Sequence, residues 1–315
     1  MSNRFFGLPI NNLRWLAISG LWLLTACTTP VDLQRLSPDP VLQQVIFDSP
    51  EIASTTFVEA VKNRNETAIQ QILGQNYKDV LPLKEVDDND IDRFLNAWQQ
   101  QHTLQDQTPE QKNLLVGEQQ WPMPIPIVHN DTGWYFDIVK GAENMRVRRI
   151  GRHERAAIQS VLAYYDAQRE YAEHDHNNDG VLEYAQKLIS SPGQKDGLYW
   201  PSSGDDPLSP LGDLLAEQSV ETAYHGYFYK ILTGQGSHAP NGAYSYLIGS
   251  QMRSGFALLA WPAVYGETGV MSFMISHDGV VYEADLGEQT ADKAKQIERF
   301  DPTPEWQKNT QIDSH

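Results

Sequence analysis

Cys27 is the only cysteine in the 315-residue sequence, and this constrains the fold more than any other feature. A chain with one cysteine forms no internal disulfide, so its stability must come from the packing of hydrophobic side chains. The composition suits this, because 40% of the residues are hydrophobic and 10% are aromatic, as in folded chains. A chain of this length usually divides into about two domains, each with its own core. We therefore expect two ordered domains without disulfides.

The first 26 residues have the three parts of a bacterial export signal. Arg4 and Arg14 give a basic start, and the apolar run 15–24 is shorter than the roughly 20 residues that cross a bilayer. Residues 24–27, Leu-Thr-Ala-Cys, resemble the bacterial lipobox, in which small residues precede a cysteine that receives a lipid. We predict that residues 1–26 are a signal peptide and that Cys27 is lipidated, which leaves no thiol for catalysis or metal binding. The alternative is an ordinary signal peptide followed by an unrelated cysteine.

The residue after Cys27 predicts the membrane that holds the protein. Thr28 stands where lipoproteins retained in the inner membrane of many Gram-negative bacteria carry aspartate. By this resemblance we expect the outer membrane, with the protein facing the periplasm or the cell surface. Residues 27–47 contain three prolines and are predicted to form a semi-extended, lipidated tether.

Acidic residues outnumber basic residues by 41 to 24, which gives a formal net charge of −17. The leader contains two of the arginines and no acidic residue, so the mature chain is more acidic still. A charge of this sign repels nucleic acid and anionic lipid, and it favours divalent cations or basic partners. We expect the lipid anchor to be the membrane contact, an envelope protein to be the partner, and no binding of nucleic acid.

Residues 48–150 are predicted to form an N-terminal domain in which helices precede strands. Ser49 followed by Pro50 is a helix start, Gly74 ends a second helix that begins near Thr67, and apolar residues around Phe94 mark a third. Strand signals follow at 114–116, 125–128 and 134–139, and Pro122, Pro124 and Pro126 indicate an edge strand because proline cannot donate a main-chain hydrogen bond. Helices on a small antiparallel sheet resemble a nuclear-transport-factor-2-like roll, a fold that identifies no function.

Four arginines form the one dense basic patch of this acidic sequence; they are Arg146, Arg148, Arg149 and Arg152. They could bind an anion or the acidic surface of a partner. They could equally form salt bridges between the two domains or a solvated helix face, which is the commoner use of such patches. The sequence assigns them no ligand.

Residues 151–305 are predicted to form a C-terminal domain, and 306–315 a tail. An apolar stripe at helical spacing predicts a helix over 154–172, and a second short helix is expected near 184–189. Five strands are expected, at 227–232, 244–249, 256–261, 270–275 and 280–283. Asp278-Gly279 is a strong hairpin signal between the last two. The predicted fold class is α+β, with one long helix on an antiparallel meander in this domain.

The C-terminal half carries the motifs of a known family. These are Tyr184-Ala185-Gln186, Ser191-Pro192-Gly193, Asp196-Gly197-Leu198-Tyr199-Trp200, Tyr224-His225-Gly226-Tyr227, Gly255-Phe256-Ala257, Trp261-Pro262-Ala263, Tyr265-Gly266-Glu267-Thr268-Gly269-Val270-Met271 and Asp278-Gly279-Val280-Val281-Tyr282. They closely resemble the bacterial family called domain of unknown function 2950, over about residues 50–290. The half is also distantly similar to the globular part of pilins and pseudopilins, but the chain lacks a prepilin leader and an uninterrupted apolar assembly helix. The family resemblance implies an envelope protein of unestablished activity.

The sharpest local signal is an acidic loop with the spacing of an EF-hand calcium site. Its predicted ligands are the side chains of Asp175, Asn177, Asp179 and Glu183 and the main-chain carbonyl of Val181. Calcium takes six to eight oxygen ligands, and a glycine at the sixth position allows the sharp turn. The twelfth position holds glutamine instead of the bidentate glutamate, so we expect weak affinity. The alternative is a polar turn without a metal.

No complete catalytic motif is present in the sequence. If the chain were an enzyme, the rival hypothesis is a periplasmic hydrolase with an unfamiliar site near His225 and Glu267. A third hypothesis is a calcium-dependent module that binds glycans or surfaces, suggested by the acidic loop and the many aromatic residues. The leading prediction is a non-catalytic outer-membrane lipoprotein that binds an envelope protein or helps to assemble one.

Overall fold

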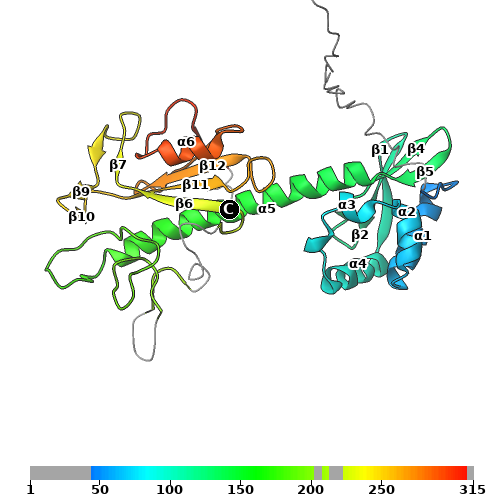
Figure 1. Cartoon of the computed structure of the whole chain (residues 1–315), viewed down its shortest axis with the longest axis horizontal. Coiled ribbons are helices and arrows are strands. Elements are labelled where there is room, and N and C mark those ends of the chain that lie inside the picture. The colour runs from blue at the N-terminus through cyan, green and yellow to red at the C-terminus, as the bar shows by residue number, and fades with distance from the viewer. Residues whose placement is uncertain (1–43, 202–207, 213–222, 311–315) are drawn as a thin grey trace, which may run out of the picture. The chain divides into compact units, whose positions relative to one another are not determined.

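The computed structural model describes residues 44–201, 208–212 and 223–310 (Figure 1). Cys27 and the predicted signal peptide lie outside the described residues. All of these described residues belong to one compact unit. Helices and antiparallel sheets alternate along the chain, which confirms the α+β class. The nuclear-transport-factor-2-like and pilin-like descriptions of its two parts stay predictions.

Short helices open the described chain, as the sequence predicts. They are α1 (Pro50–Lys62), α2 (Glu66–Leu73), α3 (Tyr77–Val80), the 3-10 helix η3 (Leu83–Glu85) and α4 (Asp88–Gln100). The Ser49 hydroxyl accepts a hydrogen bond from the N–H of Ile52 at the start of α1. At the start of α4, Asp87 and Asp90 cap each other's main-chain N–H groups in a capping box. Local capping therefore sets where these helices begin.

The first sheet is antiparallel and has the strand order β1-β2-β4-β5, with β3 paired to β2. Its strands are β1 (His102–Thr108), β2 (Gln111–Val116), β3 (Trp121–Pro122), β4 (Ile127–Asn130) and β5 (Gly133–Phe136). Its buried side chains and those of α1 and α2 form one hydrophobic cluster around Phe57, Leu114, Ile127 and Phe136. The sequence missed β1, because this strand is polar and mostly exposed and so shows no alternation of hydrophobic residues.

Helix α5 (Ile138–Tyr171) is much longer than predicted. The sequence placed its start at residue 154 and read 134–139 as strand. In the structure Asp137 caps the helix, and its carboxylate accepts a hydrogen bond from the N–H of Lys140. The helix therefore runs across residue 150, where the sequence predicted a domain boundary. The division into domains at 48–150 and 151–305 stays a prediction.

The second sheet has the strand order β14-β13-β12-β11-β6, all antiparallel. Its strands are β6 (Tyr227–Leu232), β11 (Ala257–Pro262), β12 (Met271–Ser276), β13 (Val281–Asp285) and β14 (Gln307–Lys308). The predicted turn at Asp278-Gly279 joins β12 to β13, and Gly279 has the left-handed φ of +75° that such turns favour. Four of the five predicted strands thus form the antiparallel meander, whereas the strand predicted at 244–249 lies outside this sheet, and β14 is added in the segment predicted as a tail.

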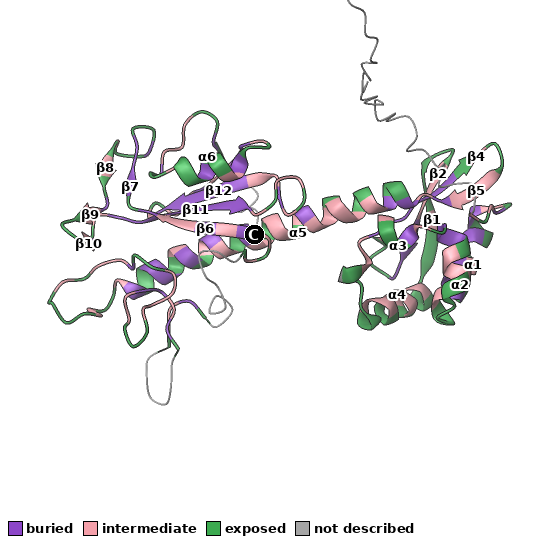
Figure 2. Ribbon diagram, viewed as in Figure 1, coloured by how far each residue is buried: buried purple, intermediate pink, exposed green. Residues whose placement is uncertain are grey.

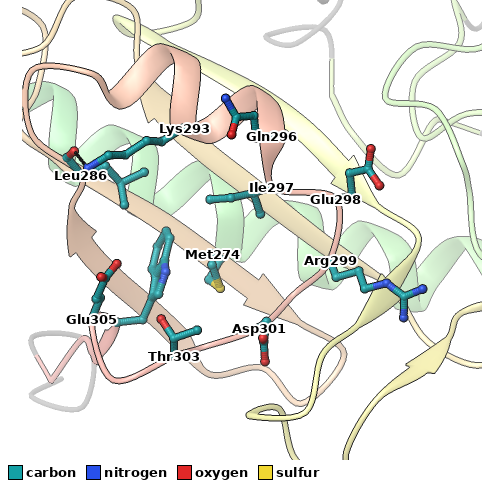
Figure 3. A pocket seen from close by; sticks show the side chains of 11 residues that line it. Met274, Leu286, Lys293, Gln296, Ile297, Glu298, Arg299, Asp301, Thr303 and Glu305 are labelled. Carbon is teal, nitrogen blue, oxygen red and sulfur yellow. Dashed lines mark hydrogen bonds between the residues drawn. The ribbon is translucent and has the colours of Figure 1, made fainter.

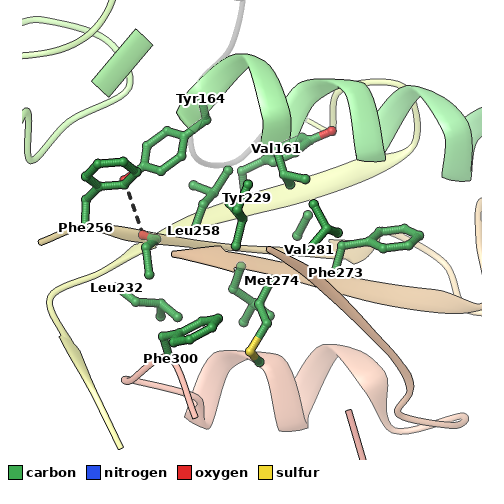
Figure 4. Packing of buried hydrophobic residues seen from close by; sticks show 14 of the residues in the cluster. Val161, Tyr164, Tyr229, Leu232, Phe256, Leu258, Phe273, Met274, Val281 and Phe300 are labelled. Carbon is green, nitrogen blue, oxygen red and sulfur yellow. Dashed lines mark hydrogen bonds between the residues drawn. The ribbon is translucent and has the colours of Figure 1, made fainter. Parts of the chain in front are cut away.

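Helices lie on both faces of the second sheet. Helix α5 packs on one face, and α6 (Thr290–Gln296), which the sequence missed, packs on the other (Figure 4). Val161 and Tyr164 of α5 point at the sheet, and Phe300 lies on the face of α6 (Figure 4). The central strands β11 and β12 are almost wholly buried, whereas α5 has an outer exposed side (Figure 2). This second core positions the sites described below.

Two-residue strands complete the described chain. They are β7 (Gly234–Gln235), β8 (Tyr244–Ser245), β9 (Leu247–Ile248) and β10 (Gln251–Met252), paired as β7-β8 and β9-β10. The segment near 184–189 is not the short helix that the sequence predicted. It is extended instead, with Tyr184 bridged to Met252 and Ile189 bridged to Tyr199. No helix among the described residues is both long and apolar enough to span a membrane.

Candidate functional site

The acidic loop follows α5 directly and is held at both of its ends. On the helix side, the rings of Tyr171 and His176 stack with centroids 4.0 Å apart. On the far side, the N–H of Tyr184 donates to the carbonyl of Met252 at 2.7 Å. Gln168, which is fully buried on α5, donates from Nε2 to the carbonyl of Ala185 at 2.7 Å and accepts from its N–H at 2.9 Å. The loop is therefore a fixed connection.

Within the loop, main-chain N–H groups hold the carboxylate of Asp175. Its Oδ1 accepts from Asn178 at 2.8 Å, and its Oδ2 accepts from Gly180 at 2.8 Å. Hydrogen bonds from the main chain, chiefly that of Gly180, lower the pKa of Asp175. Asn178 and Gly180 have positive φ angles of +59° and +81°, which bend the chain back on itself at this point. The carboxylate is thus ionised and fixed inside a tight turn.

The next two predicted ligands repeat this arrangement. Oδ1 of Asn177 accepts from the N–H of Asp179 at 3.0 Å, and Oδ1 of Asp179 accepts from the N–H of Val181 at 2.9 Å. Nδ2 of Asn177 donates to Oε1 of Glu183 at 2.8 Å. The structure therefore brings the side chains at all four predicted ligand positions, and the main chain of Val181, into one connected loop.

Glu183 has the opposite electrostatic environment to Asp175. Partial burial raises its pKa, and the negative charges of Asp179 and Asp175 raise it further, against a lowering by Arg253. The carboxylates of the loop thus repel one another at neutral pH. Among the described residues, no three or more His, Cys, Asp or Glu side chains are gathered so that they could hold a metal by themselves.

Two glutamines join the loop to the β9-β10 hairpin. Gln186, at the twelfth position of the calcium pattern, donates from Nε2 to the carbonyl of Ser250 at 2.8 Å. Gln251 donates from Nε2 to Oδ2 of Asp179 at 2.5 Å. The sequence could not identify Gln251 or the anchor Gln168, because neither lies in the loop and only the tertiary fold brings them to it.

His225 and Glu267, the residues of the hydrolase hypothesis, occupy different environments. His225 is exposed, has a φ of +46° and lies with its ring centroid 4.1 Å from that of Tyr224. Glu267 lies in the turn before β12 and forms an ion pair with Arg149 at 2.7 Å. Among the described residues, no hydrogen bond, ion pair or ring contact links His225 to Glu267, although their neighbours Gly226 and Thr268 pack closely. The geometry does not join them in one catalytic group.

The arginine patch lies in the N-terminal half of α5 and bonds to chain segments far away in the sequence. Arg146 donates to the carbonyl of Gly266, and Arg149 to the carboxylate of Glu267. Arg148 donates to the carbonyl of Pro122 at 2.7 Å. These arginines hold α5 to the turn before β12 and to β3, which is a structural role.

A hollow of about 460 Å³ lies on the exposed side of α5; we name it the α5 hollow. Its helical wall is formed by Ala156, Gln159, Ser160, Ala163, Asp166, Ala167 and Glu170, and its other lining residues are Pro210, Leu211, Gly212, Tyr224 and His225. Small side chains form most of the helical wall, and the carboxylates of Asp166 and Glu170 also line it. Among the described lining residues there is no lysine or arginine.

A second hollow of about 460 Å³ lies beside α6 (Figure 3). Met274, Ile297 and Trp306 provide apolar surface, and Lys293 donates from Nζ to the carbonyl of Leu286 at 2.7 Å (Figure 3). Charged residues of both signs surround it, including Glu298, Arg299, Asp301 and Glu305. With its acids and bases mixed, this hollow selects no class of ligand by charge.

Comparisons with known proteins identify a family and no activity. A family model described as "Protein of unknown function (DUF2950)" matches residues 44–309. No curated protein and no solved structure matches the chain.

Proposed function

Because this chain belongs to the family described as a protein of unknown function (DUF2950), which has no stated activity, we propose a function from the geometry of its acidic loop. The protein is a non-catalytic lipoprotein of the bacterial outer membrane that binds an envelope protein or helps to assemble one. Calcium bound at the acidic loop orders the surface with which the protein contacts this partner. The observation that carries this proposal is the network of hydrogen bonds at Asp175, Asn177 and Asp179.

The network leaves oxygens available at each ligand position. Every carboxylate oxygen can accept more than one hydrogen bond or metal contact, so the main-chain bonds to Asp175 and Asp179 orient these groups without exhausting them. The carbonyl of Val181 and the carboxylate of Glu183 would complete the predicted set. A hard cation such as calcium prefers oxygens of these kinds, and bound calcium supplies positive charge at the loop.

Electrostatics favour a cation in the same place. The charges of Asp175 and Asp179 add to partial burial in raising the pKa of Glu183. A bound divalent cation would remove this repulsion and would replace the hydrogen bond from Asn177 to Glu183. The bidentate glutamate of EF-hands is absent, so we expect a dissociation constant of about 10⁻⁴ to 10⁻³ M, as in extracellular calcium modules.

The loop would transmit calcium binding to a surface with exposed apolar side chains. Leu182, within the loop, is 55% exposed, and Ile248, in the hairpin that Gln251 joins to Asp179, is also 55% exposed. Exposed apolar side chains that lie together in one patch can form a surface that binds another protein. This favours a calcium-dependent contact with a partner.

The calcium hypothesis is tested by calorimetry and thermal unfolding of the full-length protein in detergent micelles. Calcium at millimolar concentration should release or absorb heat and raise the melting temperature, because it binds the native loop alone. Asp175→Asn/Asp179→Asn should lose both effects. Glu110→Gln/Glu118→Gln removes the same number of carboxylates elsewhere and should keep them. If the unaltered protein shows neither effect, the loop is only a polar connection.

The lipid anchor is tested separately at Cys27. Lipidation needs the thiol, so Cys27→Ala should abolish labelling with a fatty-acid probe and release the protein from the membrane fraction. Cys27→Ser is the closest variant in size and should behave in the same way. Labelling that persists in either variant would contradict the lipobox hypothesis.

A further inference from the structure

Strand β6 forms an outer edge of the second sheet. It pairs with β11 through Phe228 opposite Trp261 and Ile231 opposite Leu258, and no other strand follows it in the sheet order. In an antiparallel pair, the N–H and C=O groups of alternate residues point away from the partner strand. The outward residues of β6 can therefore be identified from their existing bonds.

The open part of this edge consists of two residues. Tyr227 bonds outward, because its N–H and C=O exchange hydrogen bonds with Tyr224, and the carbonyl of Thr233 accepts outward from Tyr246. By alternation, the N–H and C=O groups of Tyr229 and Ile231 also point outward, and these have no hydrogen-bond partner among the described residues. Two donors and two acceptors thus remain free on one strand edge, which is the requirement for adding another strand.

The α5 hollow adjoins this edge. Tyr224 lines the hollow, and its main chain bonds to the outward N–H and C=O groups of Tyr227 at the start of β6. From the strand, the side chain of Tyr229 points toward α5, the helix that carries most of the lining residues (Figure 4). A strand added to β6 would therefore direct alternate side chains toward the hollow, as in known cases of strand addition.

The charge of the hollow restricts what can occupy it. Asp166 and Glu170 line it, both are exposed, and neither carboxylate forms an ion pair or a side-chain hydrogen bond among the described residues. The small side chains of Ala163 and Ala167 leave room between them and the strand. An apolar stem that ends in a positive charge fits these surroundings, and an acidic side chain does not.

We propose that the open edge of β6 and the α5 hollow form a docking surface for an extended, basic segment of a partner protein. The segment adds as a strand at Tyr229 and Ile231, and a lysine or arginine enters the hollow toward Asp166 and Glu170. The inference rests on the proposed binding role and names its surface. Residues 213–222 of this chain are an unsuitable occupant by charge, because they contain three acidic residues and no basic one.

The main-chain part is tested with a synthetic peptide of about ten residues that alternates valine and lysine. N-methylation of alternate residues removes the N–H groups on one edge of the peptide only, so two peptides methylated in opposite registers serve as each other's control. We expect one register to lower the affinity for the full-length protein about tenfold or more, and the other to leave it within about twofold. Equal affinities for the two peptides would overturn strand addition.

The side-chain part is tested with variants on α5. Ala163→Leu fills the hollow at a helical position that tolerates leucine, and Asp166→Asn/Glu170→Gln removes its charge at constant size. Each should weaken binding of the unmethylated peptide about fivefold or more, and the charge variant should also reduce its salt dependence. Glu110→Gln/Glu118→Gln should bind like the unaltered protein, and a peptide with glutamate in place of lysine should not bind.

Other occupants give distinct results. If the peptide binds only after residues 213–222 are replaced by a Gly-Ser linker, the chain itself occupies the surface and the proposal is wrong. Self-association that the peptide blocks would assign the surface to a second copy and would also overturn it. If Ala163→Leu leaves the protein's capture of its envelope partner unchanged, this surface is rejected while the proposed binding role stands.

Discussion

Replacing Gln168 with methionine should destabilise the C-terminal core and release the acidic loop from α5. The Gln168 amide is fully buried and makes three hydrogen bonds, one to the hydroxyl of Tyr164 and two to the main chain of Ala185. Methionine fills a similar volume and makes none of these bonds. The N–H and C=O of Ala185 would then be buried without partners, at about 1–3 kcal/mol each. With some offset from the added apolar contacts, we expect a loss of about 3–5 kcal/mol in the free energy of unfolding.

Urea unfolding followed by tryptophan fluorescence measures the loss, and hydrogen exchange of the segment 182–188 locates it. The amide of Ala185 should exchange faster even where the core remains folded. Gln159→Met, on the exposed side of the same helix, is the matched control and should change stability by no more than about 0.5 kcal/mol. A loss below about 1 kcal/mol for Gln168→Met, or unchanged protection of Ala185, would refute the view that this amide anchors the loop.

Three further predictions concern the other residues discussed above. The pKa of Glu183 in the folded protein lies above its ordinary value of 4.5, so its favourable contribution to stability is complete below that pH and is lost as the pH rises through the folded-state pKa. At neutral pH without calcium, Glu183→Gln should therefore melt at a higher temperature than the unaltered protein. Below pH 4.5 the two proteins should melt at the same temperature. A lower melting temperature for Glu183→Gln at neutral pH would contradict the assigned repulsion. Glu267→Ala should lower stability by about 0.2–1 kcal/mol through loss of the ion pair with the largely buried Arg149, measured by urea unfolding, and a gain in stability would argue against that pair. His225→Ala should leave the fold intact and abolish no turnover in a broad hydrolase screen, whereas the loss of a measured activity would revive the hydrolase hypothesis.

Local signals in the sequence determine many of the elements without any tertiary contact. Helix α1 begins where Ser49 and Pro50 predict it, because capping and a fixed proline φ act within a few residues. Strand β6 and the turn at Gly279 also lie where alternation and turn chemistry placed them. The spacing of Asp175, Asn177 and Asp179 indicated the tight loop for the same reason, since each bonds to the main chain only a few residues away.

Other elements depended on partners that the sequence does not reveal. The run 134–139 is apolar enough to form either a strand or a helix. Asp137 caps the start of α5, so the run is divided between the end of β5 and the first residues of α5. Residues near 184–189 have helical spacing, yet they are extended because Met252 and Tyr199 pair with them. Tertiary hydrogen bonds here outweigh a weak local preference.

The candidate sites divide in the same way between sequence and tertiary structure. The identity of the oxygen ligands in the acidic loop follows from the spacing of its residues, because all of the predicted ligands lie within nine consecutive residues. That Gln168 fixes the loop, and that Gln251 reaches Asp179 across 72 positions, follows only from the packing of α5 and β10. The docking surface on β6 could not be predicted at all, because an open strand edge is defined by the absence of a neighbouring strand among the described residues and by the helix that packs beside it. Local interactions act over a few residues and can be read in order along the chain, whereas sheet edges and hollows arise only when distant segments meet.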